Sequence, residues 1–508
     1  MKFLPLLAAA LLTACAANPA TGGHNFSLVT PGEERSLGEA AAEQTLRADG
    51  LYRPESNATK YVDALCNKVY AATEAAADPV QCNLMDNGDF NAYATPGYLM
   101  VNRGLLPFIS SEAELAAVLG HESGHLNARH LNSQLTRERM ATILLAGGAA
   151  AVAVQSNNAG TTQAAIAAGS VGASLGLLAY TRSQETEADT LGRRYMENAG
   201  YEPREAVNMV HAMEMYDDYQ RHQQAAFNNG QIAPVSLLDH LKSSHPGTPE
   251  RLAATISATG LPQPISPTAD LGRQRYMQAI EGLTFGPARR YGIARKAELV
   301  LTAQRTIIPL PADTTTAYIG SGNHDNLGTW LIAHPQSGAY VTVNAVKLTP
   351  GHNPGTLLQN MLPWFHESVQ RMQLGQGEHT TIGYTATYHY LNNAKRFRAL
   401  TFASPERPED MLLLTVIYPS QAVFDREDAN LMSVLKPMTF ITEDKSATYK
   451  QLQINTFTAA IGDSVARQSS KLPVGTMQED LFRALNNLPA PAELTPGQFY
   501  KTVVDLNN

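Results

Sequence analysis

The sequence predicts an α+β protein in which a mainly helical domain with a small edge sheet is followed by a smaller α+β domain and a C-terminal module. Apolar residues recur at helical spacing through most of the first half of the chain, around one short strand-like stretch. Alternating apolar and polar residues are frequent in residues 285–441, as in half-buried strands. At 508 residues, with 44% hydrophobic and 17% charged residues, the chain is long enough for several globular cores.

The first fifteen residues have the pattern of a bacterial export signal. Met1-Lys2 is a short positive segment, and the apolar residues 3–12 are too few to span a bilayer. Leu12-Thr13-Ala14-Cys15 resembles the lipobox of bacterial lipoproteins, which implies a signal peptide over 1–14 and lipidation of Cys15. An ordinary secretory signal with an incidental cysteine is the alternative. Because alanine, not aspartate, follows Cys15, the resemblance implies a lipid anchor in the outer membrane and a body facing the periplasm.

Composition restricts the partners and the redox chemistry. The net charge of −8 offers no electrostatic basis for nucleic-acid binding. Residues 15–30 are rich in Pro, Gly, Asn and Ser and are predicted to be a tether. Apart from Cys15, the chain has only Cys66 and Cys82, sixteen residues apart. In an oxidising compartment they could form a disulfide, but two separate buried thiols fit the sequence equally well.

The residues that follow the tether predict two helices and then a group of strands. Helices are expected over 31–47 and 57–74, and strands within 81–101, with a turn at 86–89. Pro96 cannot donate a ladder hydrogen bond and therefore suits the edge of a sheet. An exposed edge can bind a peptide as an added strand. A hairpin tip that contacts no substrate is the alternative.

The most informative stretch is H-E-x-x-H at residues 121–125. The preceding residues are helix formers, and Ser110 or Ser111 can cap a helix there, with Glu114 at the capping-box position. Residues four apart share a helix face, so His121 and His125 can bind one metal ion. Glu122 is then placed to take a proton from water activated by zinc. An exposed polar helix face is the alternative.

Two Ala/Gly-rich apolar stretches, 140–154 and 164–180, follow this motif. They are short for membrane spans, and glycine weakens isolated helices. Buried or cleft-covering helices are therefore favoured over membrane insertion, and a lid that touches the membrane is a further alternative.

These motifs, together with the acidic stretch 182–189, resemble the HtpX/BepA-like family of zinc metallopeptidases over residues 31–265. The resemblance implies a zincin-type fold and one Zn²⁺ per chain, with Glu185 as the third ligand after the two histidines. It assigns Asp189 to the carboxylate that holds the imidazole N–H of His121. Glu187 is expected to point away into solvent. The substrate edge strand maps to Asn91, Ala92, Tyr93, Ala94, Pro96 and Gly97.

Residues 245–251 match the family's H-P-x-T-x-x-R element. The resemblance places His245 near the zinc, either as a switch that fills the fourth position or as a donor to the tetrahedral intermediate. Arg251 is expected to brace the loop or the active-site carboxylates. A loop histidine before a turn-forming proline is the alternative for His245.

The last two segments carry weaker signals. Residues 285–441 predict a small α+β domain of unknown role, with strands near 340–346, 383–390 and 411–418 and helices over 356–373 and 425–435. No metal-ligand cluster is evident there. Residues 448–508 contain a stretched G-D-S, L-N and L-T-P-G-Q skeleton that resembles LysM modules. That resemblance implies either peptidoglycan binding or a docking role alone.

The function expected from these motifs is zinc-dependent endopeptidase activity on misfolded or stalled envelope proteins, with Glu122 as the general base. A chaperone-like assembly factor, or a peptidoglycan-binding scaffold with latent protease activity, is the alternative. Residues 285–441 show no 34-residue helical repeat of the kind found at the C-terminus of BepA.

Overall fold

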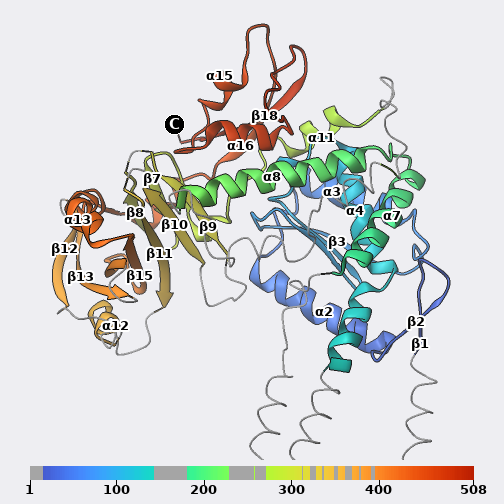
Figure 1. Cartoon of the computed structure of the whole chain (residues 1–508), viewed down its shortest axis with the longest axis horizontal. Helices are drawn as coiled ribbons and strands as arrows, with labels where there is room; N and C mark the ends of the chain where they lie inside the picture. The colour runs from blue at the N-terminus through green and yellow to red at the C-terminus, as the bar shows by residue number, and fades with distance from the viewer. Residues whose placement is uncertain are drawn as a thin grey trace, which may run out of the picture.

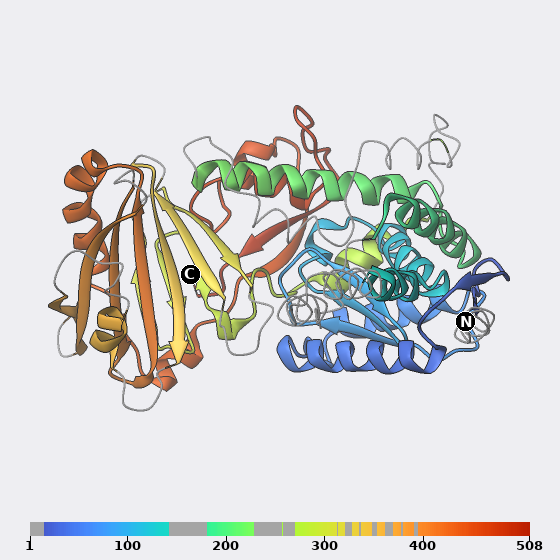
Figure 2. The same cartoon turned by 60° about the horizontal axis from the view of Figure 1, so that its bottom comes forward.

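The computed structural model describes residues 15–141, 180–227, 257, 270–311, 313–320, 328–334, 337–347, 353–360, 369–376, 379–390 and 395–507. They form an N-terminal domain (15–227 with 270–285), a β-rich domain (286–441) and a C-terminal module (443–507). Figures 1 and 2 show the N-terminal and β-rich domains at opposite ends of the molecule, with helix α8 (Glu205–Phe227) extending from one to the other. The mixed helices and sheets confirm the predicted α+β class.

The N-terminal domain surrounds a three-stranded sheet with helices. Its elements are β1 Cys15–Ala17, β2 His24–Phe26, α2 Pro31–Ala48, α3 Asn57–Tyr70, β3 Gln81–Met85, β4 Ala92–Thr95, β5 Tyr98–Asn102, η1 Leu106–Phe108, α4 Glu112–Asn127, α7 Arg182–Asn198, α8 and α11 Arg273–Ile280. Residues 130–141 are also helical. Helix α11 lies beyond the expected boundary at 265, yet Tyr276 is fully buried in the same core and donates to the Leu106 carbonyl at 2.6 Å.

The sheet has the order β3-β5-β4, so β4 is an edge strand. β4 pairs antiparallel with β5 through the turn at Pro96-Gly97, whereas β3 pairs parallel with β5. The expected turn at 86–89 therefore links two strands that are not neighbours. Alternate residues of the sheet face opposite sides: Tyr93 and Met100 pack against α2, and Ala94 and Leu99 belong to the core that contains α3 and α4.

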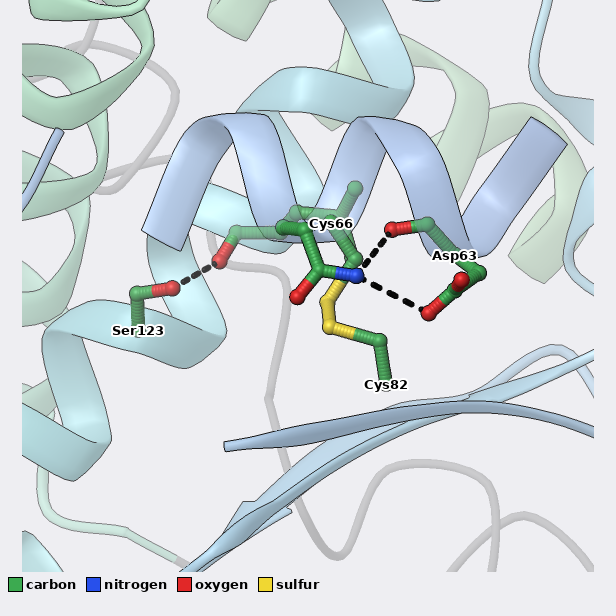
Figure 3. Close-up of a disulfide and its surroundings, with 6 residues drawn as sticks. Asp63, Cys66, Cys82 and Ser123 are labelled. Carbon is green, nitrogen blue, oxygen red and sulfur yellow. Dashed lines mark hydrogen bonds between the residues drawn. A yellow bond between two sulfur atoms is a disulfide. The ribbon is translucent and has the colours of Figure 1, made fainter. Parts of the chain in front are cut away.

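Cys66 and Cys82 form a disulfide, which resolves the alternative that the sequence leaves open. Figure 3 shows that it joins α3 to β3. The two Cα atoms are 6.1 Å apart. Ser123, labelled in the same view, belongs to α4 and donates to the Leu119 carbonyl at 2.7 Å. The covalent link therefore lies beside the helix that carries the H-E-x-x-H motif.

The β-rich domain packs a seven-stranded sheet against a four-stranded one. The larger sheet has the order β12-β13-β14-β15-β11-β10-β9 and the smaller one β16-β8-β7-β6. Its elements are η3 Arg289–Tyr291, β6 Ile293–Ala294, β7 Glu298–Leu301, β8 Thr306–Pro309, β9 Thr315–Ile319, β10 Thr329–His334, β11 Ala339–Lys347, α12 Pro354–Asn360, β12 Gln370–Gln376, β13 His379–Tyr390, β14 Lys395–Ser404, β15 Arg407–Tyr418, α13 Gln421–Leu435 and β16 Thr439–Phe440. The helix predicted over 356–373 is wrong at its end, because residues 370–376 pair with β13 as an edge strand.

The C-terminal module shares the hydrophobic core of the N-terminal domain. Its elements are α14 Glu443–Thr448, β17 Gln453–Thr458, α15 Val465–Ser469, α16 Gln478–Leu485 and β18 Phe499–Val504. The peptide N–H of Ile454 donates to the Leu283 carbonyl, and that of Gly282 donates to the Ile454 carbonyl. Phe482 is fully buried in the common core. The module is therefore integrated into the N-terminal domain.

Among the described residues, no helix is both long enough and apolar enough to cross a bilayer. Most of the two apolar stretches predicted at 140–154 and 164–180 lies outside the described residues.

Candidate metal centre

Helix α4 begins at the predicted cap and carries the H-E-x-x-H motif in its second half. Ser111 Oγ accepts from the Glu114 N–H at 3.0 Å, and the Glu114 carboxylate accepts from the Ser110 N–H at 2.8 Å. Both predicted capping residues, Ser110 and Ser111, therefore form hydrogen bonds at the N-terminus of α4. His121, Glu122 and His125 are all buried further along.

Helix α7 brings the acidic motif to the same place. Thr181 and Gln184 form a capping box at its start, which puts Glu185 in the first turn. The Gln184 side chain also donates to the His130 carbonyl at 3.3 Å, which ties the start of α7 to the residues after α4. Glu185 is fully buried and faces both histidines.

The three predicted ligands converge on one point. The Nε2 atoms of His121 and His125 lie 2.9 Å apart, and each is 3.5 Å from a Glu185 carboxylate oxygen. Ligands at about 2.0–2.1 Å from a tetrahedral zinc ion lie roughly 3.3 Å from one another, so these separations fit a zinc ion. Two imidazoles and one carboxylate leave a fourth position for water or substrate, which is the composition of a catalytic site.

The electrostatics of the centre also favour a cation. Burial by itself lowers the pKa of His121, but hydrogen bonds and charge from Asp189 and Glu185 overcome it and raise that pKa to about 10. Burial, with the charges of Glu122 and Glu185, raises the pKa of Tyr180, so its hydroxyl stays neutral. The carboxylates of Asp189 and Glu185 therefore stabilise positive charge at this point, and a divalent cation bound there would experience the same attraction.

Each metal-facing histidine has a partner on its other ring nitrogen. Asp189 Oδ1 lies 2.9 Å from His121 Nδ1, as the resemblance implies. His130 Nδ1 lies 2.8 Å from His125 Nδ1, and Glu187 Oε2 lies 3.2 Å from His130 Nε2. With Nε2 on a metal, His125 Nδ1–H donates to His130, whose Nε2–H donates to Glu187. The expectation that Glu187 is simply solvated is therefore wrong.

We expect His130→Ala to weaken zinc binding by about 10-fold to 100-fold, because the ring of His125 loses the acceptor that fixes its tautomer and orientation. The measurement is competition for zinc against a chelator of known affinity. His211→Ala is the matched control, since among the described residues His211 pairs only with Glu214 on the surface of α8. Equal zinc affinity in wild type and His130→Ala would show that His130 does not position the ligand.

Glycines allow the two ligand-bearing helices to approach closely. A Cβ on Gly192 of α7 would lie 2.6 Å from the backbone nitrogen of His121, and one on Gly120 of α4 would lie 2.5 Å from the Gly192 carbonyl oxygen. Backbone atoms cannot yield as the end of a side chain can. The short distance from Glu185 to the two histidines therefore depends on glycine at this crossing.

Gly192→Ala is expected to lower the free energy of unfolding by about 1–3 kcal/mol through overpacking. It should also weaken zinc binding at least 10-fold, because α7 must move away from α4. Thermal unfolding and chelator competition measure the two effects. Gly32→Ala in α2 is the control, since its Cβ would meet no atom within 4 Å. Unchanged zinc affinity in Gly192→Ala would contradict the argument.

The structure brings together some predicted site residues and leaves others out. The helical residues His121, Glu122, His125, Glu185 and Asp189 are assembled as expected. His245 and Arg251 lie outside the described residues, and of Cys15 only the backbone in β1 is described. The edge residues Asn91 to Gly97 do form β4 and its turn.

Sequence reasoning missed two aromatic groups at the centre. His130 follows the motif by five residues, which is the only signal it offers. Tyr180 stacks on His125 with ring centroids 4.0 Å apart, a contact that exists only in the folded chain. Nothing in the spacing of Tyr180 indicates that contact, because Tyr180 follows His125 by 55 positions.

Comparison with known proteins identifies the domain that carries this centre. The model of "Peptidase family M48" matches residues 56–258. The beta-barrel assembly-enhancing protease of Yersinia pestis is 28% identical over 182 residues, covering 35% of this chain and 37% of that protein. A putative beta-barrel assembly-enhancing protease of Vibrio cholerae is 31% identical over 218 residues, covering 40% of this chain and 44% of its own length.

A more distant relative is the mitochondrial metalloendopeptidase OMA1 of Schizosaccharomyces pombe, 25% identical over 39% of this chain and 56% of that protein. The chain thus spans less than two thirds of each relative. The crystal structure of LpqN from Mycobacterium tuberculosis matches at 14% identity and a TM-score of 0.18, over 26% of this chain and 82% of LpqN, which supports no conclusion. Residues 56–258 therefore belong to peptidase family M48, the HtpX/BepA-like zinc metalloendopeptidases.

Proposed function

We propose that this protein is a zinc-dependent endopeptidase that cleaves misfolded or stalled envelope proteins at the periplasmic face of the outer membrane. The single observation that carries the activity is the buried set of His121, His125 and Glu185 with Glu122 between the histidines on α4. The names of the relatives support envelope proteins as substrates. The lipobox-like segment that ends at Cys15 supports a lipid anchor.

The chain's own residues divide the work of peptide hydrolysis. When bound, zinc supplies Lewis acidity that lowers the pKa of water and polarises a carbonyl. Glu122 accepts the proton of the attacking water and returns it to the leaving amine. Asp189 and the pair His130–Glu187 hold the two histidine rings in the tautomers that leave Nε2 free. Because His121, His125 and Glu185 are all buried, bulk water does not compete for their metal-binding atoms.

The edge strand supplies a place for the substrate backbone. Among the described strands, β4 pairs only with β5, and its inner face packs on α4. A polypeptide can pair with such an edge only if it is extended. This requirement favours unfolded chains over folded ones and fits a quality-control role. His245 remains our candidate, from its motif, for the switch or oxyanion donor.

The C-terminal module has the element order β17, α15, α16, β18, with its two strands paired antiparallel. That order supports the LysM-like assignment of residues 448–508. Its burial against the N-terminal domain favours a docking role over glycan binding. Binding of the full-length Glu122→Gln variant to isolated sacculi would detect glycan binding.

Degradation of casein by the full chain tests the proposal. We expect cleavage in the presence of zinc, loss of cleavage with 1,10-phenanthroline and recovery when zinc is restored. A folded, disulfide-bonded protein such as lysozyme should resist. Zinc binding without any cleavage would instead favour the chaperone-like alternative, and failure to bind zinc would overturn the assignment.

A further inference from the structure

A cavity of about 540 Å³ lies between the N-terminal domain and the β-rich domain, away from the metal ligands. Its size falls within the range of ligand pockets. Residues of α2 line it from one side of the small sheet, and residues of η1 and α8 line it from the other. Asn91, Tyr93 and Thr95 of the β4 segment also contribute. Tyr93 and Thr95 point to the α2 face of the sheet, and residues 87–91 connect that face to η1 and α8, so the cavity wraps around the start of β4.

Aromatic rings from the N-terminal domain form the first wall. Phe90 stacks on Tyr216 of α8 with centroids 4.6 Å apart, and Phe108 of η1 meets Tyr216 edge-on at 4.7 Å. All three rings line the cavity. Rings that are already packed against one another lose little conformational freedom when an aromatic ligand binds beside them. An aromatic pair also contributes more free energy than its buried area alone accounts for.

Aromatic rings from the β-rich domain form the second wall. Tyr291 of η3 stacks on Tyr318 of β9 at 5.1 Å, and Tyr318 meets Trp330 of β10 at 5.3 Å. The indole N–H of Trp330 donates to the Tyr291 carbonyl at 2.7 Å, which fixes its orientation. The second domain therefore completes a pocket that the peptidase domain alone would leave open.

The polar lining selects against anions. Of the described residues around the cavity none is basic, while Asp49 and Asp89 both line it. Two further polar atoms, Thr95 Oγ1 and Asn102 Oδ1, are buried and form no hydrogen bond with another described group. Such atoms are costly to leave unpaired, and a peptide N–H could satisfy either one.

We propose that this cavity is a specificity pocket that holds an aromatic side chain of an extended, uncharged or positively charged polypeptide paired along β4. The inference rests on the proposed peptidase function and adds the substrate feature that is recognised. A peptide paired along β4 with one side chain in this cavity is held in a single register. Cleavage should therefore fall at one fixed distance from the aromatic residue.

The chain contains its own probe for binding. It has two tryptophans, and Trp330 lines the cavity. In a full-length Glu122→Gln, Trp364→Phe background, fluorescence then reports on the pocket alone. The ligands are a twelve-residue Ser/Ala/Lys peptide with one central Phe, the same peptide with Ala in its place, and N-acetylglucosamine tetramer. We expect the Phe peptide to bind at least 10-fold more tightly than the Ala peptide.

Substitutions in the cavity test whether it causes the preference for the Phe peptide over the Ala peptide. Tyr318→Ala should abolish it by removing a wall, and Gln220→Phe should abolish it by filling the space from α8. Tyr388→Ala is the control, since Tyr388 stacks on Phe397 at 4.7 Å in a different part of the β-rich domain. Equal binding of the Phe and Ala peptides, or quenching by the sugar in place of the peptide, would overturn the proposal.

Cleavage mapping separates this inference from the proposed function. Mass spectrometry of casein fragments should show aromatic residues enriched at one fixed distance from the cut in wild type, and no enrichment in Tyr318→Ala despite continued cleavage. Cleavage without enrichment in wild type would refute the pocket and leave the peptidase assignment intact. Peptide binding without any cleavage would support the pocket and refute the peptidase function.

Discussion

Glu122→Gln is expected to lower the rate of casein cleavage by about 100-fold to 10,000-fold while zinc stays bound, because a carboxamide cannot accept the proton of the attacking water. Glutamine has nearly the size and shape of glutamate, so the helix and its two histidines should keep their positions. The three ligands His121, His125 and Glu185 are untouched, and zinc content should stay near one ion per chain. The measurements are fluorescent-casein hydrolysis and metal analysis of the same samples.

The matched control is Glu197→Gln, which changes an exposed carboxylate on the same helix as Glu185. It should keep both zinc and activity. Substantial cleavage by Glu122→Gln would assign the base to another group. Loss of zinc from Glu122→Gln would mean that Glu122 supports the ligands, so that its loss of activity says nothing about proton transfer.

Lys501→Met is expected to lower the free energy of unfolding by about 3–5 kcal/mol, because it removes one member of a buried, charged network. Lys501 of β18 is fully buried and donates through Nζ to the Ile109 carbonyl, and its Nζ lies 3.4 Å from Ser110 Oγ. Glu114 at the start of α4 provides a negative charge that acts on Lys501. Burial raises the pKa of Glu114 and lowers that of Lys501, and each charge partly offsets the other's shift.

The double variant Lys501→Met, Glu114→Gln provides the internal check. It removes both charges, and the glutamine oxygen can still accept from the Ser110 N–H, so part of the lost stability should return. Thermal unfolding and limited proteolysis of residues 443–507 report the two effects. A melting temperature for Lys501→Met equal to that of wild type would show that packing alone holds the module on the N-terminal domain.

Much of the metal centre could be predicted because its parts are local. His121 and His125 share a face of α4, and Glu185 and Asp189 share a face of α7, through helical periodicity alone. Capping residues mark the start of both helices. The family resemblance then supplied what periodicity cannot, namely that the two faces meet.

The rest of the centre depends on contacts between distant segments. The pairing of His130 with Glu187 spans 57 residues, and the approach of Gly120 to Gly192 spans 72. Neither leaves a periodic pattern, because a contact across two packed helices imposes no spacing within either one. The strand at 370–376 has the same origin: its pairing with β13 outweighed the weak helical pattern of its sequence.

The chemistry of this protein can be inferred from its residues alone, since residue types at helical spacing decide which donors can share one metal ion. The position and surroundings of that chemistry depend on how distant segments pack in the folded chain. The C-terminal module enters the core of the N-terminal domain through Lys501, and the β-rich domain lends Tyr318 and Trp330 to a cavity beside β4. Both arrangements arise from burial of surfaces hundreds of residues apart, and hydrophobic burial favours any complementary apolar surface without regard to sequence order.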